Sequence, residues 1–146
     1  MSAEHRIDSK LNAQASHDRF SSMTHETFLK TWYELPLFCK SHMLISPKNY
    51  ATKRSLDLQL MLDLRLKMHV STQPNLRHPL KSWQHPWLYI AGEHDSDYVT
   101  LGTSITSEHP KGRFHCIQNA DHNCHLCEPA AVRELISNYI AALPPL

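Results

Sequence analysis

The chain has 146 residues, of which 41% are hydrophobic and 20% charged, and its formal net charge is +1. A charge so close to zero gives no electrostatic basis for binding nucleic acid or an anionic membrane. No apolar run approaches the roughly 20 residues that a membrane-spanning helix needs, and the first residues lack the apolar stretch of a secretory signal. We therefore expect a cytoplasmic protein with no nucleic-acid or membrane partner, whose four cysteines are reduced.

Residues 1–80 predict a helical segment. Apolar and aromatic side chains recur at three- and four-residue spacings between residues 17 and 40, which favours one or two amphipathic helices. Ser21 and Ser22 are candidates to cap a helix that begins at Met23, because serine oxygens accept the free N–H groups of a first helical turn.

Two prolines should delimit the helices of this segment. Pro36 should stop the first one, whereas Pro47 suits the first turn of a helix that we expect to continue to Met68. The leucines of residues 56–60 alternate as in a strand, but the length and the Leu, Met, Arg and Lys content of the stretch favour a helix.

From residue 81 the pattern becomes strand, loop and helix, repeated twice. The apolar run 86–92 and the shorter run 113–117 predict strands, and the segments 98–107 and 128–142 predict helices. This order is typical of a parallel sheet in an α/β fold.

Titratable side chains gather in the two loops that follow the predicted strands. Asp95 and Asp97 follow the first strand, while His122 and His125 follow the second. Functional groups of parallel sheets collect at the carboxyl ends of the strands, so these loops form the candidate site. We expect Asp97 to cap the next helix, which would leave Asp95 available for another role.

The same loops resemble those of the α/β-hydrolases. The segment LYIAGEHD at 88–95 is similar to their acid-bearing strand and loop, and NADH at 119–122, followed by Glu128 and Pro129, is similar to their histidine loop. The triad order in that fold is serine, acid, histidine. The resemblance implies that Asp95 is a triad acid and that His122 is a triad histidine.

A narrower resemblance rests on motifs spread over nearly the whole chain. The motifs are WYELPLF at 32–38, KRS at 53–55, ML at 61–62, QPNL at 73–76, GEHDS at 92–96 and HNCH at 122–125. Together they resemble the second half of the 2-succinyl-6-hydroxy-2,4-cyclohexadiene-1-carboxylate synthase family of menaquinone biosynthesis. The resemblance implies elimination of pyruvate from 2-succinyl-5-enolpyruvyl-6-hydroxy-3-cyclohexene-1-carboxylate, without a cofactor or a metal. It also implies that Trp32 and Arg54 contact this small, carboxylate-bearing substrate.

The chain lacks a recognisable nucleophile. It contains no Gly-x-Ser-x-Gly elbow, and the family's usual glycine before the histidine is Asp121 here. Two strands also make a sheet too small to bury both of its faces. We therefore expect a cap-like helical segment at 1–80 and an incomplete hydrolase core at 81–146. An inactive or truncated copy, and a chain that works with a complementary N-terminal hydrolase fragment, both remain open.

Two other functions remain as alternatives. Histidines and cysteines cluster within 13 residues, as His115, Cys116, His122, Cys124, His125 and Cys127. Structural zinc prefers these ligands, but no second ligand pair at the usual spacing accompanies the Cys-x-x-Cys motif. A non-enzymatic, zinc-binding small protein and a generic α/β-hydrolase esterase are thus the alternatives to the synthase.

Overall fold

The computed structural model describes residues 3–144, except for the side chains of residues 3–6 and of Tyr50. The chain divides into two compact units: unit 1 comprises Met1–Tyr33 and Ser46–Leu76, and unit 2 comprises Glu34–Ile45 and Arg77–Leu146. The segment 34–45, which we predicted within the cap-like part, is thus grouped with the sheet. None of the described helices combines the length and the apolar character that crossing a membrane requires.

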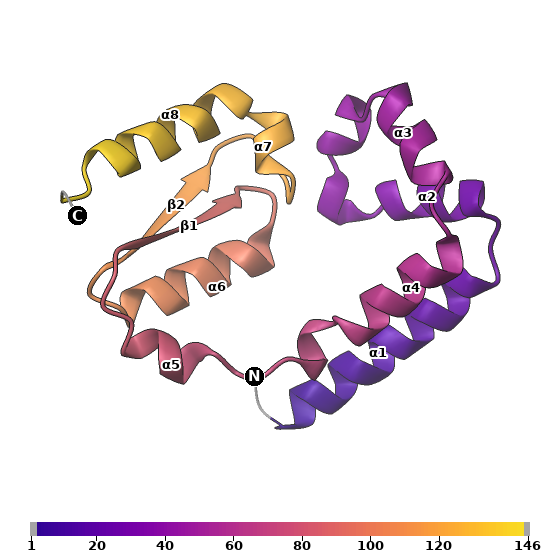
Figure 1. Ribbon diagram of the computed structural model, residues 1–146, viewed down its shortest axis with the longest axis horizontal. Coiled ribbons are helices and arrows are strands. Elements are labelled where there is room, and N and C mark those ends of the chain that lie inside the picture. The colour runs from indigo at the N-terminus through magenta and orange to yellow at the C-terminus, as the bar shows by residue number, and fades with distance from the viewer. Residues whose placement is uncertain (1–2, 145–146) are drawn as a thin grey trace. The chain divides into compact units, whose positions relative to one another are not determined.

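Unit 1 consists of helices. Its elements are α1 (Ala3–Ser21), α2 (His25–Tyr33), α3 (Pro47–Arg54), α4 (Leu58–Lys67) and the 3₁₀ turn η3 (Val70–Thr72). Helix α1 packs along α4, and α2 packs against α3 (Figure 1). The rings of Phe20 and Phe28 meet edge to face at 5.3 Å, and Leu62 of α4 is fully buried. Apolar packing therefore holds the helices of this unit together.

Helix α2 begins two residues later than we predicted. The Oγ1 of Thr24 accepts the N–H of Thr27 at 3.2 Å, so Thr24 caps the helix. Ser22 cannot act as the cap, because its hydroxyl donates to the carbonyl of Arg19 at 2.8 Å and closes the end of α1. The predicted start at Met23 is wrong for this reason.

The helix predicted from Pro47 to Met68 is in fact two helices. Its start at Pro47 is confirmed, and the Oγ of Ser46 caps it by accepting the N–H of Asn49 at 3.2 Å. The chain leaves the helix after Arg54, and a new cap forms where Asp57 Oδ1 accepts the N–H of Leu60 at 2.9 Å. An aspartate that binds its own nearby backbone competes with a continuous helix and starts a second one.

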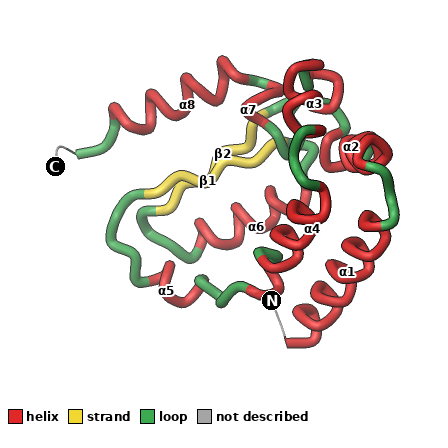
Figure 2. Tube along the Cα trace, turned by 45° about the vertical axis from the view of Figure 1, so that its right-hand side comes forward, coloured by secondary structure: helices red, strands yellow, loops and turns green. Residues whose placement is uncertain are grey.

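Unit 2 contains the sheet. Its strands are β1 (Trp87–Gly92) and β2 (Gly112–Ile117), and its helical elements are η1 (Pro36–Phe38), η2 (Ser41–Leu44), α5 (Arg77–Lys81), α6 (Ser96–Ser107), α7 (Cys124–Cys127) and α8 (Pro129–Ala141). The strands pair in parallel, from Trp87 opposite Gly112 to Gly92 opposite Ile117, which confirms the predicted α/β pattern. Helix α6 lies on one side of the strand pair and α8 on the other (Figures 1 and 2).

Local details of unit 2 differ from the prediction. Helix α6 begins at Ser96 rather than at Tyr98, and Asp97 lies exposed in its first turn instead of capping it. Asp95 occupies the cap position, but its side chain makes no capping hydrogen bond. The carboxylate of Asp95 is therefore available to another partner. The short helices α5 and α7 were not predicted.

Candidate active site

The loops after the two strands bring Asp95 and His122 together. The Nδ1 of His122 lies 2.6 Å from Oδ2 of Asp95. The Asp95 side chain is 5% exposed and that of His122 is 32% exposed. Because a carboxylate can only accept, the imidazole donates its Nδ1–H and keeps a lone pair on Nε2. None of the described residues forms a hydrogen bond with this Nε2. The pair can therefore act as a base toward a group that approaches Nε2.

Two aromatic rings fix the orientation of the imidazole. The ring of Tyr98 meets His122 edge to face at 4.9 Å, and the buried ring of Phe38 does so at 6.2 Å. The backbone N–H of His122 also donates to the carbonyl of Leu37 at 3.3 Å. The histidine is thus held from two sequence-distant parts of unit 2, namely the segment 34–45 and helix α6.

Gly92 permits the close approach of the two loops. The N–H of Glu93 donates to the carbonyl of Ile117, and that of His94 donates to the carbonyl of Ala120, both at 2.9 Å. A Cβ atom placed on Gly92 would lie 2.1 Å from the carbonyl oxygen of Asp121. No side chain fits there, so a glycine is required where the loop after β1, which carries Asp95, passes the loop after β2, which carries His122.

Asp121 anchors the histidine loop from within the core. Its fully buried carboxylate accepts the N–H groups of Ser41 and Lys40 at 2.7 and 2.9 Å, and that of Asn123 at 2.9 Å. Burial opposes ionisation, but these backbone hydrogen bonds outweigh it and lower the pKa of Asp121. The aspartate that departs from the family's usual glycine therefore ties the residue before His122 to the turn η2.

The predicted substrate-binding residues Trp32 and Arg54 both lie in unit 1. Trp32 is half-buried, with its ring 5.9 Å from that of Phe28 and 4.9 Å from the guanidinium carbon of Arg65. The Arg54 side chain is 57% exposed and forms a 3.4 Å ion pair with Glu26. Trp32 is thus packed in an aromatic cluster, whereas Arg54 lies on the surface of its unit.

The cysteines near His122 lie in surroundings that favour the protonated thiol. Burial raises the pKa of the Cys116, Cys124 and Cys127 thiols, although zinc binds the deprotonated form. The Cys127 thiol donates to Asp121 at 3.4 Å. Among residues 3–144, no group of three or more histidine, cysteine or acidic side chains is placed to hold a metal ion. The zinc alternative gains no support from this geometry.

Sequence reasoning missed three of the residues that surround His122. Tyr98 could have been found, because it lies three residues after Asp95, about one helical turn further on. Phe38 lies inside a motif used for the family resemblance, but nothing local placed it beside His122. Asp121 stood out only as a departure from the family pattern.

A parallel strand pair flanked by helices, with an acid after one strand and a histidine after the next, defines the C-terminal part of an α/β-hydrolase fold. A solved structure, MenH from S. aureus, matches this chain with a TM-score of 0.83 and 20% sequence identity, over 97% of this chain and 54% of that chain. The predicted fold class is thereby confirmed.

Several relatives that match in sequence share the name 2-succinyl-6-hydroxy-2,4-cyclohexadiene-1-carboxylate synthase. The protein from Enterobacter sp. (strain 638) is 27% identical over 128 residues, which are 84% of this chain and 46% of the relative. The protein from Klebsiella pneumoniae is 24% identical over 140 residues, 96% of this chain and 54% of the relative. No family model matches the chain. The chain spans about half the length of the curated relatives it matches, in agreement with the predicted resemblance to their C-terminal half.

Proposed function

We propose that this chain supplies the acid and the histidine of a pyruvate-eliminating synthase of menaquinone biosynthesis. The observation that carries the proposal is the 2.6 Å contact between Asp95 and His122 in the loops that follow β1 and β2. The name shared by the curated relatives supports the choice of reaction. The absence of disulfides among the four cysteines is consistent with work in the reducing cytoplasm.

In this reaction His122 acts through its free Nε2. The imidazole takes up the proton of a serine hydroxyl, and the activated oxygen removes a proton from the cyclohexene ring of the substrate. The bond from the ring carbon to the enolpyruvyl oxygen then breaks with its electron pair on the oxygen. The released enolate takes up one proton to become pyruvate, and the imidazolium gives up the proton it had accepted, which restores the neutral histidine. Asp95 holds the imidazole in the productive tautomer and stabilises the imidazolium that forms.

The serine has to come from polypeptide outside this sequence. Among the described residues, no hydroxyl or thiol forms a hydrogen bond with His122. We infer that an N-terminal hydrolase segment, in the same polypeptide or as a separate partner, adds strands to the sheet beside β1. Strand β1 pairs only with β2 in the described sheet, so its second edge has backbone groups available for such a strand.

We assign substrate binding to Trp32 and Arg54. The ion pair of Arg54 with Glu26 joins two exposed side chains, and such pairs contribute little free energy. A substrate carboxylate can therefore replace Glu26 as the partner of the guanidinium, which binds carboxylates in a two-point geometry. Trp32 would contribute its ring face or its indole N–H.

The test uses a chimeric chain that joins the N-terminal half of the Enterobacter sp. synthase to the present sequence. We expect pyruvate release from the pathway intermediate by the chimera and none by the present chain alone. A matched chimera whose elbow serine is replaced by alanine should be inactive. A folded chimera that releases no pyruvate contradicts the proposal, and hydrolysis of p-nitrophenyl acetate without pyruvate release would favour the esterase alternative.

A further inference from the structure

A cavity in unit 2 lies away from Asp95 and His122. Its volume is about 680 Å³, within the range of small-molecule sites. Its lining begins at Pro86 and Pro110, which precede the two strands, whereas Asp95 and His122 follow the strands' carboxyl ends. The cavity is therefore at the opposite end of the sheet from the candidate active site.

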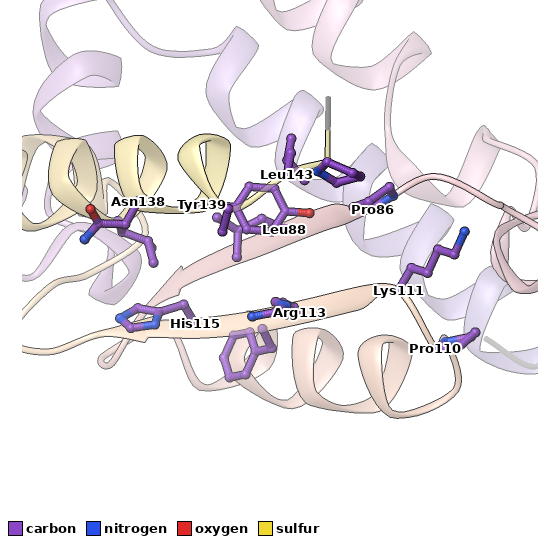
Figure 3. Close-up of a pocket in the computed structure, with 13 residues that line it drawn as sticks. Pro86, Leu88, Pro110, Lys111, Arg113, His115, Asn138, Tyr139 and Leu143 are labelled. Atoms are coloured by element: carbon purple, nitrogen blue, oxygen red, sulfur yellow. The ribbon is translucent and has the colours of Figure 1, made fainter. Parts of the chain in front are cut away.

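The polar groups of the cavity come from two facing elements. Arg113 and His115 are two residues apart on β2, so their side chains project from the same face of the sheet. Figure 3 shows them along the strand, with Asn138 and Tyr139 of α8 across from them. None of these four side chains forms a hydrogen bond or ion pair with another described residue, and the Tyr139 hydroxyl is buried without a partner. A hydroxyl with no accessible surface cannot reach a ligand in the cavity, so the ring of Tyr139, rather than its hydroxyl, borders it.

The remaining lining is apolar. Leu88, Leu135 and Leu143 supply it, together with the prolines at the strand starts. Lys111 also borders the cavity, but its ammonium donates to the carbonyl of Gln84 at 2.6 Å. Arg113, whose side chain is exposed, is thus the lysine or arginine of this lining that makes no hydrogen bond or ion pair with a described residue. A single cation matches a ligand with one negative charge rather than a phosphate.

We propose that this cavity binds a small molecule that carries one carboxylate on an apolar body. The guanidinium of Arg113 pairs with the carboxylate, since a planar fork and a carboxylate form two parallel hydrogen bonds. The leucines and the ring of Tyr139 cover the apolar part. This site does not depend on the proposed synthase activity.

The test compares 2-naphthoate with its uncharged analogue 2-naphthamide in titrations of the ¹⁵N-labelled chain followed by NMR. We expect naphthoate to bind about tenfold more tightly than the amide, because hydrogen bonds to charged groups are the stronger ones. The shifted amides should lie in β2 and α8. Arg113→Gln should weaken naphthoate binding about tenfold and leave the amide unaffected.

Arg133→Gln is the matched control, because Arg133 is an exposed arginine of α8 outside the cavity lining. It should leave the affinity for naphthoate unchanged. Equal affinity for the two compounds, an equal loss in both arginine variants, or shifts confined to other elements would overturn the proposal. Absence of binding by the folded chain would also overturn it and would leave the cavity as a surface for packing against protein.

Discussion

The two units differ in the kind of contact that stabilises them. Unit 1 relies on a cluster of rings and leucines, and several of its large apolar side chains stay on the surface, such as Leu11 at 63% and Met68 at 68% exposure. Unit 2 buries polar side chains instead, among them Ser41, Asp95 and Asp121. Hydrogen bonds are directional and apolar contacts are not, so unit 2 can fix the position of a loop to within a fraction of an ångström.

Directional hydrogen bonds therefore position the candidate site in unit 2, whereas apolar packing stabilises unit 1. In unit 2 the pair of Asp95 and His122 is held by the crossing at Gly92, by the Asp121 anchor and by two rings. In unit 1, Trp32 contacts the ring of Phe28 and the guanidinium of Arg65. We therefore expect substitutions in the loops of unit 2 to lower the rate of the reaction, and polar substitutions in unit 1 away from Trp32 and Arg54 to have small effects.

The largest effect should come from Asp95→Asn in the chimera. An amide in place of the carboxylate favours the wrong imidazole tautomer, which lowers kcat by about 10⁴-fold in triad enzymes. Steady-state pyruvate release measures this loss. The control is Asp97→Asn in the same loop, where an exposed carboxylate is removed and kcat should stay within about twofold. Equal losses in the two variants would contradict the assignment of Asp95.

A second prediction concerns Gly92, where the loop after β1 passes close to the loop after β2. Gly92→Ala places a Cβ against the backbone carbonyls of Ala120 and Asp121, and we expect the free energy of unfolding to fall by about 3 kcal/mol. Gly102→Ala is the comparison, because the atoms nearest to its Cβ would belong to the rings of Tyr89 and Phe114, which can move. Denaturant unfolding of the two variants should show the larger loss for Gly92, and the reverse order would contradict the crossing.

A third prediction concerns the Asp121 anchor. Asp121→Asn turns an amide NH₂ toward backbone N–H donors, so we expect a loss of about 1–2 kcal/mol at pH 7. The folded pKa of Asp121 is lowered, so its stabilisation is present above the unfolded value of about 3.9 and disappears as the pH falls through the folded value. The difference between the two proteins should narrow below about pH 4. A difference that stays constant with pH would contradict the charged anchor.

The smallest expected change is in the pH dependence of the stability of unit 1. His17 joins two helices, since its Nε2 lies 2.9 Å from Asp63 and its Nδ1 lies 3.3 Å from Asp18. The hydrogen bonds with Asp63 and Asp18 raise the pKa of His17. Its contribution is therefore complete below the unfolded value of about 6.5 and is lost as the pH rises through the folded value.

Amide hydrogen exchange measures this effect. Exchange corrected for its intrinsic pH dependence should become faster in α1 and α4 as the pH rises, while β1 and β2 stay unchanged. His17→Gln should remove the pH dependence, and His78→Gln, at an exposed histidine of unit 2, should preserve it. Retention of the pH dependence without His17 would assign it to other groups.

The sequence allowed the strands and their order to be predicted, because each strand is a short apolar run with local boundaries. The loops that hold Asp95 and His122 followed from the same reasoning, since strand ends in a parallel pair share one edge. The break at Asp57 was missed because a local cap competes with a periodic pattern that runs past it. The anchor by Asp121 was out of reach, because its partner Ser41 lies 80 residues earlier in the chain.

The most direct measurement compares two histidines of one loop in the pyruvate-releasing chimera. His122 contacts Asp95, whereas His125 is exposed three residues later and has no described contact with the acid. We predict that His122→Ala lowers kcat by about 10⁴-fold, as for Asp95→Asn and at the upper end of the range for loss of a general base, and that His125→Ala leaves it within about twofold. A His122→Ala chimera that stays folded and releases pyruvate at the unchanged rate would contradict the central claim that this chain supplies the catalytic base.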